Sequence, residues 1–284
     1  MSASAPLANK PQAWKKDIPK HLFIFFVLML ELFPLYMMLQ ISVKNNTTFN
    51  ANQWLPSLPN EWEWSNFVYG FNLIMPSVAN TVFVAVSGTV LTLCLAICAA
   101  YFFARYRMPL GGFLWGVFLL IMLIPGVANI VPLFVLLKNM NLLNTLWALI
   151  IVGVAGGQVF AIFILKNFIE DIPKDLFEAA EIDGANHLQQ VVNVVVPLCA
   201  PIIGTLFILA FLGKWNDFLL PLIVLRDQEL FTIGVSLIYL DGEYNKDYGK
   251  IMASFFIASL PLIIIFMFTM KLFVKGLSSG AVKG

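Results

Sequence analysis

Six long apolar runs constrain this chain more than any other feature of its sequence. Each holds roughly twenty residues, and at about 1.5 Å per residue a helix of that length crosses the hydrocarbon of a bilayer. Hydrophobic residues make up 60% of the 284 positions and charged residues only 12%, which excludes an ordinary water-soluble domain. The expected membrane-spanning segments are residues 21–43, 78–103, 110–137, 144–165, 198–225 and 251–274.

The apolar runs are continuous and do not alternate with polar residues, so they predict helices and exclude a β-barrel. The expected fold is therefore an all-α integral membrane protein with six transmembrane helices in one domain, residues 21–274. A polar, proline-containing leader, residues 1–20, precedes it, and a tail, residues 275–284, follows. The first run is about twice as long as the apolar part of a signal peptide, and no small-residue cleavage site follows it, so we expect a retained span.

The distribution of Lys and Arg predicts the orientation in the membrane. With a cytoplasmic N-terminus, the inner segments carry eleven Lys and Arg and the outer segments five, while Lys214 falls within a span. Because basic residues favour the cytoplasmic side, both termini are expected there. The net charge of +1 gives no indication of a nucleic-acid partner.

Glu31 lies near the middle of the first expected span. The Leu, Ile, Phe and Val residues around it favour insertion by roughly 4 to 8 kcal/mol, against about 3 kcal/mol for one central charge. The span is therefore expected despite its acid. Two interpretations of Glu31 stay open: a group on a polar pathway, or an interior acid that is protonated or hydrogen-bonded.

Several small or special residues within the spans predict local features. Kinks are expected in the third and fifth spans at Pro125, Pro132, Pro201 and Pro221. Close helix packing is expected in the fourth span at Gly153, Gly156 and Gly157. The cysteines lack metal-type spacing and are expected to be small packing residues: Cys94, Cys98 and Cys199.

A polar stretch, residues 166–197, separates the fourth and fifth runs. Its middle has the pattern of a short capped helix, with Asp171 and Pro173 at the start and Gly184 as the stop. The orientation above places this helix on the cytoplasmic side, where an external partner is expected to bind it. The alternative is a solvated acidic loop helix.

Motifs for catalysis are missing from the sequence. It has two histidines, and it contains no H-E-x-x-H, no G-x-S-x-G and no G-x-x-x-x-G-K-[ST] phosphate loop. A membrane hydrolase is therefore disfavoured, and energy for transport is expected from a gradient or from a partner protein.

Several motifs together resemble one family. EAAEIDGA at 178–185, followed by Pro197, resembles the EAA loop of permease subunits in binding-protein-dependent ABC importers. The segments at 99–112, 124–145, 214–225 and 274–284 are similar to the carbohydrate-uptake branch, specifically to its second, maltose-transporter-type permease. The similarity extends from about Leu22 to the end of the chain. Val196 and Glu31 depart from the family pattern.

The resemblance implies a type I permease fold with a short cytoplasmic coupling helix, residues 171–182, and a second helix, 186–196, that braces it. Glu178 is expected to make a charge-assisted contact with a basic residue of the ATPase. The residues implied in ATPase coupling are Leu176, Phe177, Glu178, Ala179, Ala180, Asp183, Gly184 and Pro197.

Other sites are implied less directly. Trp215, Asn216 and Asp217 are candidates for the substrate path or its gate, with interhelical packing as the open alternative. The tail residues Lys283 and Gly284 are candidates for an ATPase contact, with a disordered tail as the alternative. Aromatic residues of the first outer loop fit an interfacial belt or the docking of a solute-binding protein: Trp54, Trp62, Trp64 and Tyr69.

The sequence thus predicts a non-catalytic permease of the bacterial cytoplasmic membrane that forms half of the path for a sugar or oligosaccharide. The implied partners are an ABC ATPase dimer, a second permease, a solute-binding protein and lipid. No cofactor is expected in this chain, whereas ATP and Mg²⁺ are expected in the ATPase. The alternative is a gradient-driven secondary transporter or channel.

Overall fold

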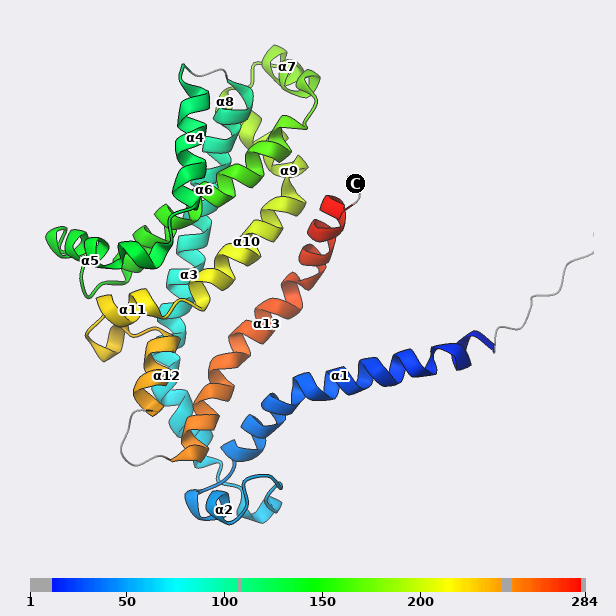
Figure 1. Cartoon of the computed structure of the whole chain (residues 1–284), viewed down its shortest axis with the longest axis vertical. Coiled ribbons are helices and arrows are strands. Elements are labelled where there is room, and N and C mark those ends of the chain that lie inside the picture. Colours follow the sequence, from blue (N-terminus) through cyan, green and yellow to red (C-terminus); the bar gives the residue numbers. More distant parts are fainter. Residues whose placement is uncertain (1–11, 107–108, 242–246, 282–284) are drawn as a thin grey trace, which may run out of the picture. The chain divides into compact units, whose positions relative to one another are not determined.

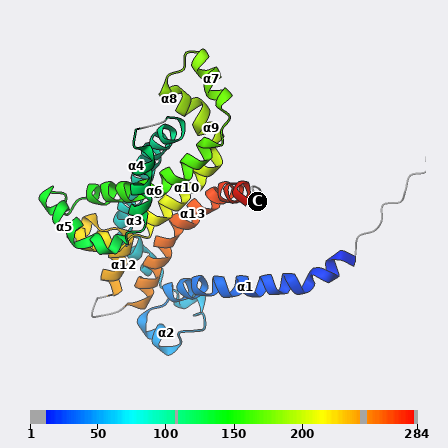
Figure 2. The ribbon, with the colours of Figure 1, turned by 45° about the horizontal axis from the view of Figure 1, so that its top comes forward.

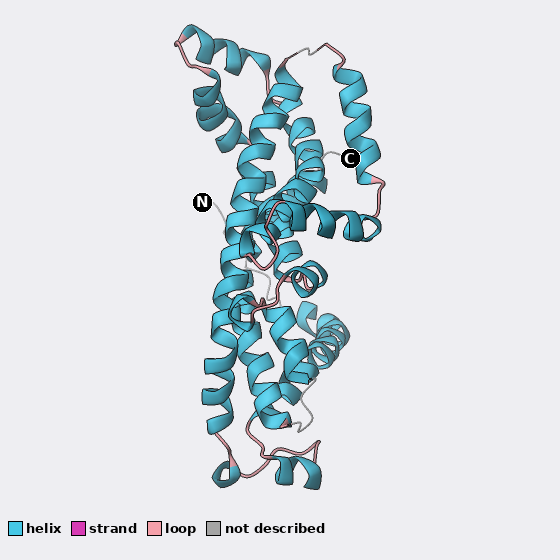
Figure 3. Cartoon of the chain, turned by 90° about the vertical axis from the view of Figure 1, so that its left-hand side faces the viewer, coloured by secondary structure: helices cyan, strands magenta, loops and turns pink. Residues whose placement is uncertain are grey.

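The computed structural model describes residues 12–106, 109–241 and 247–281. These residues form helices joined by loops, without a strand among them (Figure 3). The predicted all-α class is therefore confirmed. The chain divides into two compact units, which are described separately: unit 1 is Met1–Gly70 with Asn245–Phe256, and unit 2 is Phe71–Tyr244 with Ile257–Gly284.

Unit 1 contains α1 (Gln12–Ser42), α2 (Asn46–Ala51), the 3₁₀ turn η1 (Pro59–Glu61) and the first residues of α3 and α13. Its polar packing centres on Lys44, whose ammonium donates to the carbonyls of Asn52 and Leu55, both at 2.7 Å. The amide of Asn66 donates to the carbonyls of Ser42 and Lys44 at 3.0 and 2.9 Å. Burial lowers the pKa of Lys44.

Unit 2 contains most of α3 and all elements from α4 to α12 (Figures 1 and 2). The helices are α3 (Ser65–Arg105), α4 (Gly111–Met122), η2 (Gly126–Asn129), α5 (Ile130–Asn139), α6 (Leu146–Glu170), α7 (Lys174–Ile182), α8 (His187–Gln190), the π-helix η3 (Val191–Val195), α9 (Val196–Leu198), α10 (Ala200–Trp215), α11 (Leu219–Val224), η4 (Gln228–Leu230) and α12 (Ile233–Asp241). The last helix, α13 (Tyr248–Ala281), contributes to both units.

Five segments of the described chain are long and apolar enough to cross a membrane, and a bent helix pair raises the number to six. The five are Asp17–Ser42, Ser65–Arg105, Leu146–Glu170, Ala200–Val224 and Tyr248–Met267. They correspond to the first, second, fourth, fifth and sixth expected spans. The second helix begins thirteen residues before the expected start at residue 78.

The third expected span, residues 110–137, is not one straight helix. It is broken between Met122 and Gly126, and its two parts meet at 92°. Pro125 has extended backbone angles, φ −61° and ψ 125°, and the residue before a proline also avoids the helical region. The kink expected at Pro125 is therefore confirmed as a full break, whereas Pro132 lies inside α5.

The fifth span is also interrupted, between Trp215 and Leu219. Pro221 follows this break within α11, while Pro201 occupies the first turn of α10, where a proline costs no hydrogen bond. The kink predicted at Pro221 therefore corresponds to a break just before that residue. Pro201 lies instead at the start of a helix.

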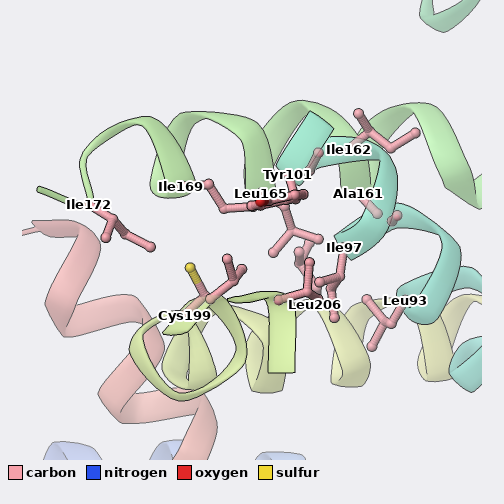
Figure 4. Close-up of a cluster of buried hydrophobic side chains, with 14 of the residues drawn as sticks. Leu93, Ile97, Tyr101, Ala161, Ile162, Leu165, Ile169, Ile172, Cys199 and Leu206 are labelled. Atoms are coloured by element: carbon pink, nitrogen blue, oxygen red, sulfur yellow. The ribbon is translucent and has the colours of Figure 1, made fainter. Parts of the chain in front are cut away.

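The main core of unit 2 lies between α3, α6 and α10, where Leu93, Ile97, Leu165, Ile169 and Leu206 point toward one another (Figure 4). Cys199 is buried in the same cluster, as expected for a small packing residue. The other two cysteines, Cys94 and Cys98, are exposed on α3 and do not pack into this core.

Candidate functional site

The helix α7 begins at Lys174, directly after Pro173, and ends at Ile182, two residues before Gly184. Gly184 has φ +79°, a left-handed conformation that glycine adopts without steric cost. Two hydrogen bonds close the end of the helix: the Gly184 N–H donates to the Glu181 carbonyl at 3.0 Å, and the Ala185 N–H donates to the Ala180 carbonyl at 2.9 Å. This is the Schellman arrangement. The expected stop is confirmed, although the helix starts three residues after Asp171.

One face of α7 is held inside the protein by Phe177, which is fully buried. The Arg105 guanidinium carbon lies 4.0 Å from the centroid of the Phe177 ring, and the Tyr101 ring is 6.2 Å away. A cation over an aromatic face is attracted by the ring electrons. Phe177, one of the residues expected in ATPase coupling, is the residue that attaches α7 to α3.

The opposite face of α7 is open. Leu176 is 45% exposed and Ile182 is 87% exposed. Among the other predicted coupling residues, Ala180 is half-buried. The rest are exposed: Glu178, Ala179, Asp183, Gly184 and Pro197. The structure therefore brings acidic and apolar side chains together on one accessible surface, which we call the α7 face: Leu176, Glu178, Ala179, Ile182 and Asp183.

A polar cluster connects α3 to the segment after α7, and we call it the tyrosine–histidine cluster: Tyr101, Tyr106, His187 and Gln190. The Tyr101 hydroxyl donates to Gln190 Oε1 at 2.7 Å, and the Tyr106 hydroxyl lies 3.0 Å from His187 Nδ1. The Gln190 amide also reaches the Glu181 carboxylate and the Ala185 carbonyl, both at 3.4 Å. Gln190 is 2% exposed, so its bonds join α3, α7 and α8 within the protein interior.

The second predicted helix, residues 186–196, is present as α8, η3 and α9 in succession. Asn186 caps α8 by accepting from the Gln189 N–H at 2.9 Å, and Gln189 Oε1 accepts from the Asn186 N–H at 2.8 Å. The π-helical turn ends at Val195, two residues before Pro197, whose missing N–H and ring disturb the regular hydrogen-bond pattern. Figures 1 and 2 place α7 and α8 together at one end of unit 2.

The candidate path residues lie at the break between α10 and α11. Trp215 is 7% exposed and its ring packs on Phe211 at 5.5 Å. The Asn216 amide donates to the Leu212 carbonyl at 2.9 Å, and Asp217 accepts hydrogen bonds from the backbone of Leu219 and Leu220. All three side chains thus make internal contacts at a helix break, and a role in the substrate path stays a prediction.

A lysine inside the fifth span lies in a glycine-lined slot between α3 and α6. The Lys214 ammonium donates to Thr92 Oγ1 at 3.3 Å. A Cβ at Gly88 would lie 2.8 Å from Lys214 Cε, and one at Gly153 would lie 3.2 Å from the same atom. A Cβ at Gly157 would lie 3.8 Å from the Lys214 ammonium nitrogen. Of the glycines expected to permit close helix approach, Gly153 and Gly157 therefore make room for the Lys214 side chain, whereas a Cβ at Gly156 would meet nothing within 4 Å.

Two candidate residues, Lys283 and Gly284, lie outside the described residues. Glu31 is exposed on α1, and its role is still open. In residues 12–106, 109–241 and 247–281, no three His, Cys, Asp or Glu side chains gather as a metal site would require.

Comparisons with known proteins identify the family. A family model described as a binding-protein-dependent transport system inner membrane component matches residues 93–279. The probable ABC transporter permease protein YurM of Bacillus subtilis is 32% identical over 263 residues, which are 92% of this chain and 87% of that protein. The arabinooligosaccharides transport system permease protein AraQ of Bacillus subtilis is 30% identical over 282 residues, covering 98% and 100% of the two chains.

A solved structure has the same fold. One chain of a bacterial ABC transporter involved in the import of the acidic polysaccharide alginate matches with a TM-score of 0.78 at 22% identity, over 94% of this chain and 99% of that chain. The predicted resemblance is confirmed: the chain belongs to the family of inner membrane components of binding-protein-dependent transport systems.

Proposed function

We propose that this chain forms half of the translocation path of an ATP-driven sugar importer and receives force from a cytoplasmic ATPase through α7. The observation that carries this proposal is the α7 face, an exposed acidic and apolar surface on a helix that Phe177 fixes to the protein interior. Because transport requires energy that this chain has no phosphate loop to supply, ATP and Mg²⁺ belong to the partner ATPase.

The α7 face is suited to a groove on another protein. Six acids and two lysines lie between Lys166 and His187, so a groove lined by Arg or Lys is complementary to it. Glu178 provides a charge-assisted hydrogen bond to such a group, while Leu176 and Ile182 provide apolar contact. Motion of α7 then reaches α3 through Phe177 and the tyrosine–histidine cluster, and it reaches α10 through η3 and α9.

The solute is proposed from the relatives. AraQ is named for the transport of arabinooligosaccharides and matches almost the whole chain, so a sugar or oligosaccharide is the solute class. The family description includes a binding protein, which we propose delivers the solute at the outer face. A second permease completes the path, and Trp215, Asn216 and Asp217 border it. Both termini lie in the cytoplasm, where the tail residues Lys283 and Gly284 contact the ATPase.

The test exchanges the charge on the α7 face. A hydrogen bond to a charged group contributes about 1.5 to 3 kcal/mol, so Glu178→Lys is expected to weaken ATPase docking by roughly ten- to a hundredfold. Glu61→Lys is the matched control, because Glu61 is also exposed but lies in the outer loop. Transport and solute-stimulated ATP hydrolysis are measured in proteoliposomes, with the amount of inserted permease as reference.

The expected result is a loss of both activities in Glu178→Lys at normal membrane levels, with Glu61→Lys unchanged. Full transport in Glu178→Lys would refute coupling through α7. Co-purification separates the importer from a gradient-driven porter, since only an importer brings down an ATPase and a second permease. The sugar that raises ATP hydrolysis, presented with its binding protein, identifies the solute.

A further inference from the structure

A large cavity lies within unit 2 beside the first turns of α3. Its volume is about 880 Å³, which falls in the range of small-molecule sites. Side chains of α3, α11, η4 and α12 line it, and its polar members are Asn72, Ser77, Gln228, Glu229, Ser236 and Tyr239. None of these residues belongs to the α7 face, to the tyrosine–histidine cluster or to the break at Trp215.

The wall of the cavity is held in place by hydrogen bonds between segments far apart in sequence. The Asn80 amide donates to the carbonyls of Glu229 and Phe231 at 2.7 and 3.1 Å. The Ile233 N–H donates to Thr81 Oγ1 at 2.9 Å in the interior. A preformed wall reduces the ordering that a ligand must impose when it binds.

An aromatic ring and several polar groups remain available inside this wall. The Tyr239 ring stacks on Phe231 at a centroid distance of 4.9 Å, and Tyr239 is 54% exposed. Around it, the amides of Asn72 and Gln228 and the carboxylate of Glu229 have no hydrogen bond to another described residue. Amides donate and accept, and a carboxylate accepts, so together they match the hydroxyl groups of a sugar.

The cavity lies toward the outer end of α3. Asn72 precedes the first residue of the expected second span, residue 78, by six positions, or about 9 Å along a helix. In the orientation proposed above, this end of α3 faces the side where a binding protein releases its solute. The placement of the cavity therefore rests on the proposed function.

We propose that this cavity is a carbohydrate-binding site of this permease, with the Tyr239 ring against a sugar ring and Asn72, Gln228 and Glu229 on its hydroxyls. Glu229 is the one charged residue among those that line the cavity in the described chain. Its negative charge repels a carboxylate, so the site selects neutral sugars over acidic ones.

The test is saturation-transfer NMR on the complex that co-purifies with this chain, in lipid nanodiscs and without ATP. Raffinose, maltotriose and arabinotriose serve as neutral probes, and trigalacturonate serves as the acidic probe. We expect transfer to at least one neutral probe and a loss of about tenfold in Tyr239→Ala. Tyr239→Phe, which keeps the ring, and Tyr36→Ala, an exposed tyrosine outside the cavity, retain the transfer.

Gln228→Ala is a second variant, because it changes an exposed amide and leaves the backbone bonds of the wall in place; it also lowers the transfer. Glu229→Gln raises transfer to trigalacturonate. The site is refuted if no neutral probe shows transfer, or if transfer is equal in Tyr239→Ala and Tyr36→Ala. Its selectivity is refuted if Glu229→Gln leaves the transfer to trigalacturonate unchanged. Since the assay uses no ATP, a failure here is distinct from a failure of solute-stimulated hydrolysis, which would refute the proposed function.

Discussion

Phe177 offers the sharpest test of how α7 is attached to the rest of the protein. Its side chain is fully buried and lies under the Arg105 guanidinium at 4.0 Å. Replacing a buried phenylalanine by alanine costs about 3 to 5 kcal/mol, and loss of the cation–π contact falls within that range. Because about 1.4 kcal/mol is a factor of ten, local opening of α7 should increase by roughly two to three and a half orders of magnitude.

Hydrogen–deuterium exchange measures this opening directly. In Phe177→Ala, peptides that cover Lys174–Ile182 should exchange faster, by up to the two to three and a half orders of magnitude given above. The increase cannot exceed the factor by which α7 is protected from exchange in the native chain. Peptides from α6 should change little, because they retain their own core contacts. Phe177→Leu is the matched control, since it keeps an apolar side chain and costs less.

Transport links this measurement to function. If α7 transmits force through Phe177, ATP hydrolysis in Phe177→Ala proceeds with less solute moved per ATP than in Phe177→Leu. Exchange in Phe177→Ala within about threefold of the native rate, less than 1 kcal/mol, would refute the conclusion that Phe177 fixes α7 to α3.

Two further predictions concern packing. Lys214→Met fills the same slot without a charge, so the free energy of unfolding in detergent should fall by less than about 1.5 kcal/mol. Lys214→Ala empties the slot and should lower that free energy by about 2 to 3 kcal/mol. Equal melting temperatures of the two variants would contradict this packing role. Gly249→Ala places a methyl group against the Lys44 carbonyl and the Asn66 amide, so the yield of folded protein should fall sharply. Gly116→Ala, whose added methyl group meets open space, should fold normally. Fluorescence-detected size-exclusion chromatography compares the folded yields of the two variants.

Features that depend on neighbouring residues in the sequence were predicted well. The apolar runs correctly predicted five of the six spans as single helices. The reason is that backbone groups in hydrocarbon have no water to bond, so they must form hydrogen bonds within the same segment. The end of α7 was also predictable, since Gly184 is the residue type that a left-handed helix end favours. The break at Pro125 was foreseen as a kink, but its angle depends on how α4 and α5 each pack.

Features that depend on distant residues were not predicted. Tyr101 meets His187 and Gln190 across 86 and 89 positions, and no spacing rule relates such residues. The sequence names Phe177 as a coupling residue but does not predict its burial, because its motif does not reveal which face of a short helix is buried. Tyr101 and Arg105, one helical turn apart at the end of an apolar run, were the available indication of a contact surface there.

The right-angled joint between α4 and α5 also has a consequence for biogenesis. The two helices have 12 and 10 residues, so at about 1.5 Å per residue neither one reaches across the hydrocarbon alone. Leu123 and Ile124 at the joint lie outside any helix and are largely exposed. Non-helical backbone at membrane depth is tolerated only against protein or water. In the importer proposed above, the second permease would cover this joint, and a newly made copy of this subunit would be incomplete before assembly. Membrane proteases should therefore remove unassembled copies, which would match the amount of this permease to that of its complex.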